Sequence, residues 1–351
     1  MTHTAEKNRL DVHSKMRSEI EDIPDALRRL LNSSNGPVFT AAQELRKLDP
    51  RFITTIARGS SDHAAAYLKY EIELVANIPV ASIGPSIASI YGKLLRLEKS
   101  ASISISQSGK SPDIVQMAES TVKSGALAIA LTNDVEAPLG QGCSHTIDIC
   151  AGAEISVAAT KTFVTSIVAG LMLLAHWKND QHLLDALHKL PGQASKAIQC
   201  DWQPLNDRLK DESSLFILGR GPSMAIANEV ALKFKETCQI HAEAYSSAEV
   251  LHGPVSIVGQ GYPVLALIAR DASEQSIVGT IDQLAEQGAD VYATSKQSNK
   301  SRQLDFVETG HSLTDPLLLI VSFYSFIEKL ARQRGLNPDI PPNLNKVTRT
   351  V

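Results

Sequence analysis

The sequence predicts an α/β protein made of two tandem αβα sandwiches, each with a mainly parallel five-stranded sheet. Three observations support this prediction. The chain has 351 residues, which is too long for one ordinary domain and sufficient for two. Short apolar segments alternate with amphipathic segments, and their connections are long enough for helical crossovers. A strand pattern ending at Arg58-Gly59 recurs at Arg220-Gly221, an offset of 162 positions (220 minus 58).

The first elements are predicted from apolar periodicity. Residues 1–45 are expected to form a helical lead, because apolar positions from Met16 to Leu31 recur at helical spacing. Residues 166–177 form the longest apolar run, which is well short of the roughly 20 residues that cross a bilayer and therefore predicts a buried helix. Strands of the first half are expected at residues 52–57, 80–83, 101–106, 126–132 and 145–149, with helices between them.

The second half follows the same plan after a linker at residues 188–205. Pro191-Gly192 in this linker predicts the end of a helix. The prolines at 338, 341 and 342 exclude a regular helix near the C-terminus and predict an extended arm. Strands of the second half are expected at residues 215–219, 241–244, 264–268, 290–293 and 310–313.

These features divide the chain into four parts. Residues 1–45 are the lead, 46–200 the first domain, 201–336 the second domain and 337–351 a tail. The N-terminal segment is polar and lacks the apolar core of a secretory signal, so a cytoplasmic protein without membrane association is expected.

Composition excludes several function classes. The formal net charge of −4 shows no basic surplus, which argues against a nucleic-acid partner. Cys143, Cys150, Cys200 and Cys238 lack the spacing of a metal or redox site, so they are expected to be buried thiols. We therefore expect neither a metal site nor a disulfide framework.

A hydroxyl-rich loop follows the predicted strand at residues 101–106. A strand–loop–helix junction directs backbone N–H groups and the positive helix end at an anion, so a sugar phosphate is the expected guest. The alternative is that Ser108 or Ser111 merely caps a helix. The offset of 162 places residues 268–271 (Ile-Ala-Arg-Asp) opposite residues 106–109 (Ser-Gln-Ser-Gly). Only the first half keeps the hydroxyls, which favours a phosphate site.

Several stretches of the chain are similar to one known family. The segments SQSG, GAEISVAATKTF, LGRG, ALKFKE, IHAEAYSSAE, LHGP and NLNKVT resemble the double sugar-isomerase (SIS) domain family, and most closely the isomerase half of glutamine–fructose-6-phosphate aminotransferase. The resemblance extends from about residue 16 to the C-terminus. It implies that the loop holds the phosphate through Ser61, Ser106, Gln107, Ser108 and Ser111, in a pocket that also contains Gly59, Ser60, Val157 and Ala159.

The same resemblance implies a set of catalytic groups. Glu236 would shuttle the proton between C2 and C1, with Lys233 as its companion and Glu229 in or near the pocket. His252 would open the sugar ring, and it would act in the site of a neighbouring subunit, so a homodimer is expected. Lys346 would form a Schiff base, although electrostatic closure of the pocket is an alternative.

The residues themselves are compatible with these roles. Lys233 and Glu236 are three positions apart, so they share a helix face, where such a pair is more often a solvated surface pair. An imidazole such as that of His252 changes charge near neutral pH and can relay protons, although a lone histidine is usually structural. A tail lysine such as Lys346 is usually solvated.

The departures from the family bear on the reaction. The chain begins without the glutaminase segment of the synthase, so conversion of glucosamine 6-phosphate and water to fructose 6-phosphate and ammonia is expected, without a cofactor. The alternatives are another amino-sugar phosphate, namely galactosamine 6-phosphate or a fructosamine 6-phosphate conjugate, or a non-catalytic phosphosugar-sensing module. Further departures are Ser60, Ser111 and Ala159, and Lys110, which is expected to add a cation beside the phosphate loop.

Overall fold

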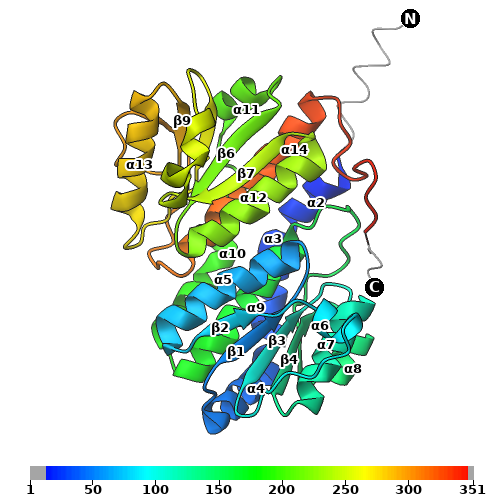
Figure 1. The fold of residues 1–351 in the computed structure, drawn as a ribbon. Coiled ribbons are helices and arrows are strands. Elements are labelled where there is room, and N and C mark those ends of the chain that lie inside the picture. The colour runs from blue at the N-terminus through cyan, green and yellow to red at the C-terminus, as the bar shows by residue number, and fades with distance from the viewer. Residues whose placement is uncertain (1–12, 347–351) are drawn as a thin grey trace, which may run out of the picture.

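Two parallel sheets organise the computed structural model, which describes residues 13–346 (Figure 1). The strand order is β2-β1-β3-β4-β5 in the first sheet and β10-β9-β8-β6-β7 in the second, and all strand pairs in the described residues are parallel. Read from β7, the second order repeats the plan of the first. The predicted fold class, two α/β sandwiches with five-stranded parallel sheets, is therefore confirmed.

The first sheet is buried on both faces by helices, as is typical of parallel sheets. Every position of β3 (Ala101–Ile105) is buried, including the hydroxyl-bearing Ser102 and Ser104. The other strands are β1 (Ile53–Ile56), β2 (Val80–Ser82), β4 (Leu127–Thr132) and β5 (His145–Asp148). The helices packed against this sheet are α4 (Asn35–Leu48), α5 (Ser60–Ala76), α7 (Pro112–Lys123), α8 (Pro138–Gly142) and α9 (Lys161–Lys178), with α6 (Ser86–Ser89) packed on α7.

The second sheet has the same layering with smaller elements. A compact apolar core lies between this sheet and α13, and includes Phe216, Val264, Ile281 and Val291. The strands are β6 (Ser214–Gly219), β7 (His241–Ser246), β8 (Pro263–Ala266), β9 (Asp290–Ala293) and β10 (Arg302–Gln303). The other elements are α10 (Gln181–Ala197), α11 (Gln203–Leu209), α12 (Pro222–Cys238), η1 (Glu249–His252), η2 (Pro254–Ile257), α13 (Glu274–Glu286) and α14 (Asp315–Gln333).

The two halves share one large core in the middle of the molecule. Helices α5, α9, α12 and α14 lie between the two sheets, and their buried apolar side chains form one continuous cluster (Figure 1). Helix α5 of the first half packs directly against α12 of the second. This contact brings the start of α5 close to polar groups of α12.

The helical lead packs on this core, as its periodicity predicts. In α2 (Lys15–Glu21) and α3 (Ile23–Ser33) the apolar positions are buried, among them Met16, Ile20, Leu27 and Leu30. Ser14 caps α2, because its hydroxyl accepts a hydrogen bond from the Arg17 N–H at 3.0 Å. The lead is therefore part of the globular body.

The last predicted strand is wrong. Residues 310–313 form turns before α14, and the fifth strand is β10, eight residues earlier in the chain. Gly310 has a positive φ of 77°, and the His311 carbonyl accepts hydrogen bonds from the backbone of Thr314 and Asp315, which closes a turn there. A strand of two residues is too short to leave a period-two pattern in the sequence.

The predicted helix end at Pro191-Gly192 is also wrong. Helix α10 continues through Pro191 to Ala197. Its buried face, which includes Leu183, Leu187, Leu190 and Ala194, packs on α3, α9 and α14. This tertiary packing offsets the hydrogen bond that proline removes from a helix.

The expectation of four buried thiols holds only for Cys238. Cys143, Cys150 and Cys200 are partly exposed because they lie where α8, β5 and α10 end and the chain turns at the surface. The tail has no helix from residue 336 to 346, as its prolines predict, and residues 347–351 lie outside the described residues. Between residues 13 and 346, no helix has both the length and the apolar character that a membrane span needs.

Candidate active site

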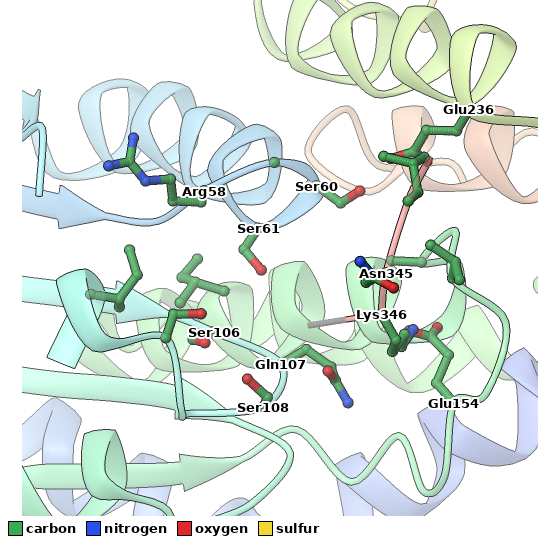
Figure 2. Close-up of a pocket in the computed structure, with 17 residues that line it drawn as sticks. Arg58, Ser60, Ser61, Ser106, Gln107, Ser108, Glu154, Glu236, Asn345 and Lys346 are labelled. Carbon is green, nitrogen blue, oxygen red and sulfur yellow. The ribbon is translucent and has the colours of Figure 1, made fainter. Parts of the chain in front are cut away.

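A cavity of about 350 Å³ lies at the carboxyl ends of β1 and β3 (Figure 2). The strand order reverses between these two strands, and crevices at such positions are the usual ligand sites of parallel sheets. Residues from three separate parts of the chain line the cavity: loops of the first half, Glu236 of the second half and residues 344–346 of the tail. The fold thus brings both halves to one site.

The hydroxyl-rich loop lines one side of this cavity. Ser106, Gln107, Ser108 and Ser111 are all among its lining residues, and Ser61 faces them from the start of α5 (Figure 2). Gly109 closes the loop with a φ of 62°, and a Cβ atom there would lie 2.7 Å from the Ala137 Cβ. The loop therefore requires glycine at this position.

Helices α5 and α7 both begin at the cavity. Ser60 and Ser61 form the first turn of α5, which follows Gly59 with a φ of 56°, and Ser111 directly precedes α7. Within the described residues the Ser111 side chain makes no capping hydrogen bond, so its hydroxyl is available to a ligand. Two helix N-termini with adjacent hydroxyls favour an anion here.

Two charged side chains near this loop have partners of their own. Arg58 lines the cavity, and its guanidinium binds the buried Asp113 carboxylate at 2.8 Å, which ties the β1 loop to α7. Lys110 pairs with Asp134 at 2.8 Å and is not among the described residues that line the cavity. Lys110 thus lies beside the phosphate loop, and its charge is paired with that of Asp134.

Opposite the loop, α12 presents a row of charged residues. Glu229, Lys233 and Glu236 follow each other at intervals of four and three residues and thus share one face of α12. The Lys233 ammonium lies 2.6 Å from Oε2 of Glu236 and 3.1 Å from Oε1 of Glu229. It also donates a hydrogen bond to the Ser60 hydroxyl at 3.0 Å. Only Glu236 reaches the cavity, with 19% of its side chain exposed.

Burial and charge together set the protonation of this row. Burial acts to lower the pKa of Lys233, but the carboxylates of Glu229 and Glu236 outweigh it and raise that pKa above the ordinary value. Burial acts to raise the pKa of Glu229, but the Lys233 charge and the His63 hydrogen bond hold it below 4.5. Lys233 is therefore a permanent ammonium, and Glu229 is ionised at neutral pH.

The tail delivers Lys346 to the opposite rim of the cavity. Its ammonium lies 2.8 Å from Oε2 of Glu154 and donates to the Ser156 carbonyl, also at 2.8 Å (Figure 2). Glu154 is fully buried and accepts further hydrogen bonds from the backbone of Thr160 and the hydroxyl of Thr162. Burial acts to raise the pKa of Glu154, but the Lys346 charge and these donors hold it below 4.5.

The structure thus brings most of the predicted site residues together. Gly59, Ser60, Val157 and Ala159 line the cavity beside the phosphate loop, Glu236 and Lys346. Lys233 and Glu229 lie behind Glu236 without reaching the cavity. Among residues 13–346, the side chains that line this cavity do not include His252, which is exposed at the end of η1.

Sequence reasoning missed several residues of the site. Ile105, Ile114, Leu344 and Asn345 also line the cavity, as do Arg58 and Glu154. Arg58 belongs to the repeated Arg-Gly pattern and Glu154 to the segment GAEISVAATKTF, so the sequence patterns identified the right segments. Glu154 lies in an irregular loop, where no periodicity predicts the direction of a side chain.

The second half lacks an anion site at the matching position for a structural reason. Arg270 lies opposite Ser108 in the repeat, and both its backbone N–H and its guanidinium bind the buried Asp315 carboxylate. This internal ion pair occupies the loop with the protein's own charges. Within residues 13–346, no group of three or more His, Cys, Asp or Glu side chains is arranged to hold a metal ion.

Comparison with protein families identifies the SIS domain in this chain. The family model for the SIS domain matches residues 48–176 and 208–314, one segment in each half. The glutamine–fructose-6-phosphate aminotransferase of Sulfolobus acidocaldarius is 30% identical over 343 residues, which cover 94% of this chain and 56% of the relative. The chain thus spans about half the length of the curated relatives it matches.

Two solved structures are similar over nearly the whole chain. A provisionally assigned phosphosugar isomerase from Silicibacter pomeroyi DSS-3 has a TM-score of 0.91 and 54% identity, covering 93% of this chain and 100% of that one. The C-terminal domain of the glucosamine–fructose-6-phosphate aminotransferase from Francisella tularensis has a TM-score of 0.82 and 25% identity, covering 94% and 99%.

Proposed function

Because this chain belongs to the SIS domain family and is similar to its phosphosugar isomerases, we propose that it is a glucosamine-6-phosphate deaminase. In this proposal residues 46–200 bind the phosphate, residues 201–336 supply the base, and the tail at 337–351 covers the site. One observation carries it: the hydroxyl loop at residues 106–111, Glu236 and Lys346 line the same cavity of about 350 Å³. That volume suits a hexose monophosphate, with its phosphate at one end and C1 and C2 near the carboxylate.

The proposed reaction balances with water as the second substrate. After ring opening, Glu236 removes the proton from C2 of the amino-aldose and returns it to C1, while a second proton passes from the amine nitrogen to the C1 oxygen. The C1 aldehyde thus becomes an alcohol and the C2 amine becomes an imine. Water then adds to C2, and ammonia leaves to give fructose 6-phosphate. This direction needs water as its only second substrate, whereas amination requires a source of ammonia.

The charge row on α12 supports the role of Glu236 as the base. A base must be ionised and must reach the substrate, and Glu236 is the member of the row that lines the cavity. Charge develops on oxygen and nitrogen as the proton leaves C2, and the Lys233 ammonium 2.6 Å from Glu236 can offset it. Lys233 is too deeply buried to act as a nucleophile.

The position of His252 supports a homodimer in which each copy completes the other's site. His252 is exposed and lies outside the cavity of its own chain, and its neighbours Leu251 and Ile257 expose 37% and 61% of their surface. A second copy covering this surface would place the imidazole where it can relay the ring-opening proton.

Lys346 has two roles open to it in this proposal. Its ammonium is bound to Glu154 and Ser156, so it holds the tail across the rim of the cavity and closes the pocket electrostatically. Schiff-base formation with the ketose would require this amine to leave Glu154 and lose its proton.

Release of ammonium from glucosamine 6-phosphate tests the proposal directly. Pure protein should form ammonium and fructose 6-phosphate in equal amounts, and turnover at the background rate would contradict it. A parallel assay with galactosamine 6-phosphate and fructosamine 6-phosphate conjugates decides the substrate. Glu236→Gln should abolish turnover while fructose 6-phosphate still binds. Binding by the wild type without turnover of any sugar would favour a sensing module.

A further inference from the structure

His63 lies at the interface between the two halves, outside the short segments that carry the family resemblance. It is one helical turn after Ser60 on α5, and its Nδ1 lies 2.9 Å from Oε2 of Glu229 on α12. The His63 side chain keeps 23% of its surface exposed, whereas that of Glu229 is completely buried. This pair therefore connects a partly exposed imidazole to the buried end of the charge row.

The direction of this hydrogen bond follows from the charge of its acceptor. Glu229 is ionised at neutral pH, so its oxygens only accept hydrogen bonds. Nδ1 of His63 must therefore carry the proton and donate it, whichever charge the ring has. Glu229 Oε1 is bound by the Lys233 ammonium at 3.1 Å and faces the Tyr324 hydroxyl at 3.4 Å. His63 thus supplies the donor to the remaining oxygen.

His63 faces the buried carboxylate that the charge row leaves without a cation of its own. Two carboxylates, of Glu229 and Glu236, surround the single ammonium of Lys233, so the row carries one uncompensated negative charge behind a buried surface. Burying such a charge is costly unless dipoles or a cation face it. The other charged neighbours on the His63 side are Asp62 and Arg58, on the same segment. The imidazole is therefore the group that faces the buried carboxylate from the first half.

Helix α5 holds α12 at two points through this arrangement. Ser60 accepts from Lys233 and His63 donates to Glu229, and the two contacts are one turn apart on both helices. Since Ser60 and Ser61 also line the cavity, the same turn of α5 borders the phosphate loop and fixes the charge row. A shift of Glu229 would move Lys233, and with it the group that neutralises charge beside Glu236.

We propose that His63 is a positioning residue, which acts through Glu229 to hold the Lys233 ammonium between Ser60 and Glu236. The inference rests on the proposed function for the role of Glu236, but the contact itself can be tested without turnover. Without the imidazole donor, Lys233 is drawn toward Glu229, and Glu236 loses its cation. The phosphate loop is unaffected, so substrate binding should not change.

A comparison of three variants tests this role by steady-state kinetics. His63→Leu removes the donor and should lower kcat at least tenfold while KM changes less than threefold. His63→Asn keeps an N–H donor at the same place and should restore kcat to within threefold of the wild type. His176→Leu on α9 is the matched control, because that half-exposed imidazole bonds Asn35 far from the cavity, and it should leave kcat unchanged. Equal losses in His63→Leu and His63→Asn would overturn the proposal.

The dependence on Glu229 gives a second, sharper readout. This readout is a double-mutant cycle of His63→Leu and Glu229→Gln. If His63 acts only through Glu229, adding His63→Leu to the Glu229→Gln variant should lower kcat less than twofold. The same cycle can be measured through Tm, which requires no turnover. His63→Leu should lower Tm when it is introduced into the wild type and should leave Tm unchanged when it is introduced into Glu229→Gln. Additive effects in either cycle would overturn the positioning role. A wild type that turns over no sugar, with a coupled Tm cycle, would contradict the proposed function and leave the contact established.

Discussion

Lys346 of the tail and Glu154 of the first half form an ion pair of 2.8 Å at the rim of the cavity, 192 positions apart in the chain. The carboxylate is fully buried and has several further donors, whereas 25% of the lysine side chain is exposed. A partly exposed cation of the tail is therefore bound to a buried anion that Thr160 and Thr162 already hold in place. This asymmetry suggests that Glu154 determines where the tail lies.

Replacing Glu154 should free the tail. In Glu154→Gln the ion pair is lost, and hydrogen bonds to charged groups contribute about 1.5–3 kcal/mol. Trypsin should then cleave after Lys346 at least about fivefold faster in this variant than in the wild type. The cleavage rate can be measured by mass spectrometry of the released C-terminal peptide. Glu98→Gln, at an exposed carboxyl, is the matched control, and trypsin should cleave it at the wild-type rate. Equal cleavage rates in all three proteins would show that the pair does not hold the tail.

The same substitution should change the stability of the protein in acid. Because the folded pKa of Glu154 lies below its ordinary value of 4.5, its contribution to stability is complete above that value and is lost as the pH falls through the folded pKa. The Tm of the wild type should therefore fall more steeply than that of Glu154→Gln between pH 5 and 3. Parallel Tm curves in calorimetry would contradict this assignment.

The hydroxyl of Ser111 is predicted to serve a ligand rather than the fold. Since it does not cap α7 within the described residues, Ser111→Ala should leave Tm unchanged. One lost hydrogen bond of about 0.5–1.5 kcal/mol should weaken binding of fructose 6-phosphate roughly two- to tenfold in calorimetric titration. Ser14→Ala is a control with the opposite expectation, because the Ser14 hydroxyl caps α2 and donates a hydrogen bond to Glu328. This variant should have a lower Tm and should bind fructose 6-phosphate as the wild type does.

A buried carboxyl on α5 should limit stability at high pH. Burial raises the pKa of Glu71 well above 4.5, and the charge on Asp271 adds to this rise. A raised carboxyl pKa stabilises the fold at pH values below the ordinary value and loses that contribution as the pH rises toward the folded pKa. Glu71→Gln should therefore raise Tm at pH 8 by about 2 °C or more and have little effect at pH 4.5. Glu119→Gln, an exposed carboxyl on α7, should change Tm at neither pH.

The interface between the halves could be predicted only in part. The spacing of Lys233 and Glu236 placed them on one helix face, and the structure confirms that shared face. Their partner Ser60 and the more distant His63 could not be predicted, because nothing in the spacing of α5 indicates which of its faces meets α12. The predicted helix end at Pro191 was wrong because packing on α3, α9 and α14 outweighs the local proline signal. The predicted strand at 310–313 was wrong because these residues form a turn and the true fifth strand, β10, has only two residues.

The sequence by itself determined the two-lobed parallel architecture, because strand length, helical periodicity and the repeat at 162 positions can all be read from the order of the residues. It also located the hydroxyl loop, since a loop between a buried strand and a proline-initiated helix is defined by adjacent residues. Only the tertiary structure decided that Glu154 receives the tail, that Asp315 fills the matching loop of the second half and that His252 stays outside its own cavity. These contacts join residues that are far apart in the sequence. Their geometry depends on how whole helices and loops pack, and this packing cannot be predicted from a local sequence pattern.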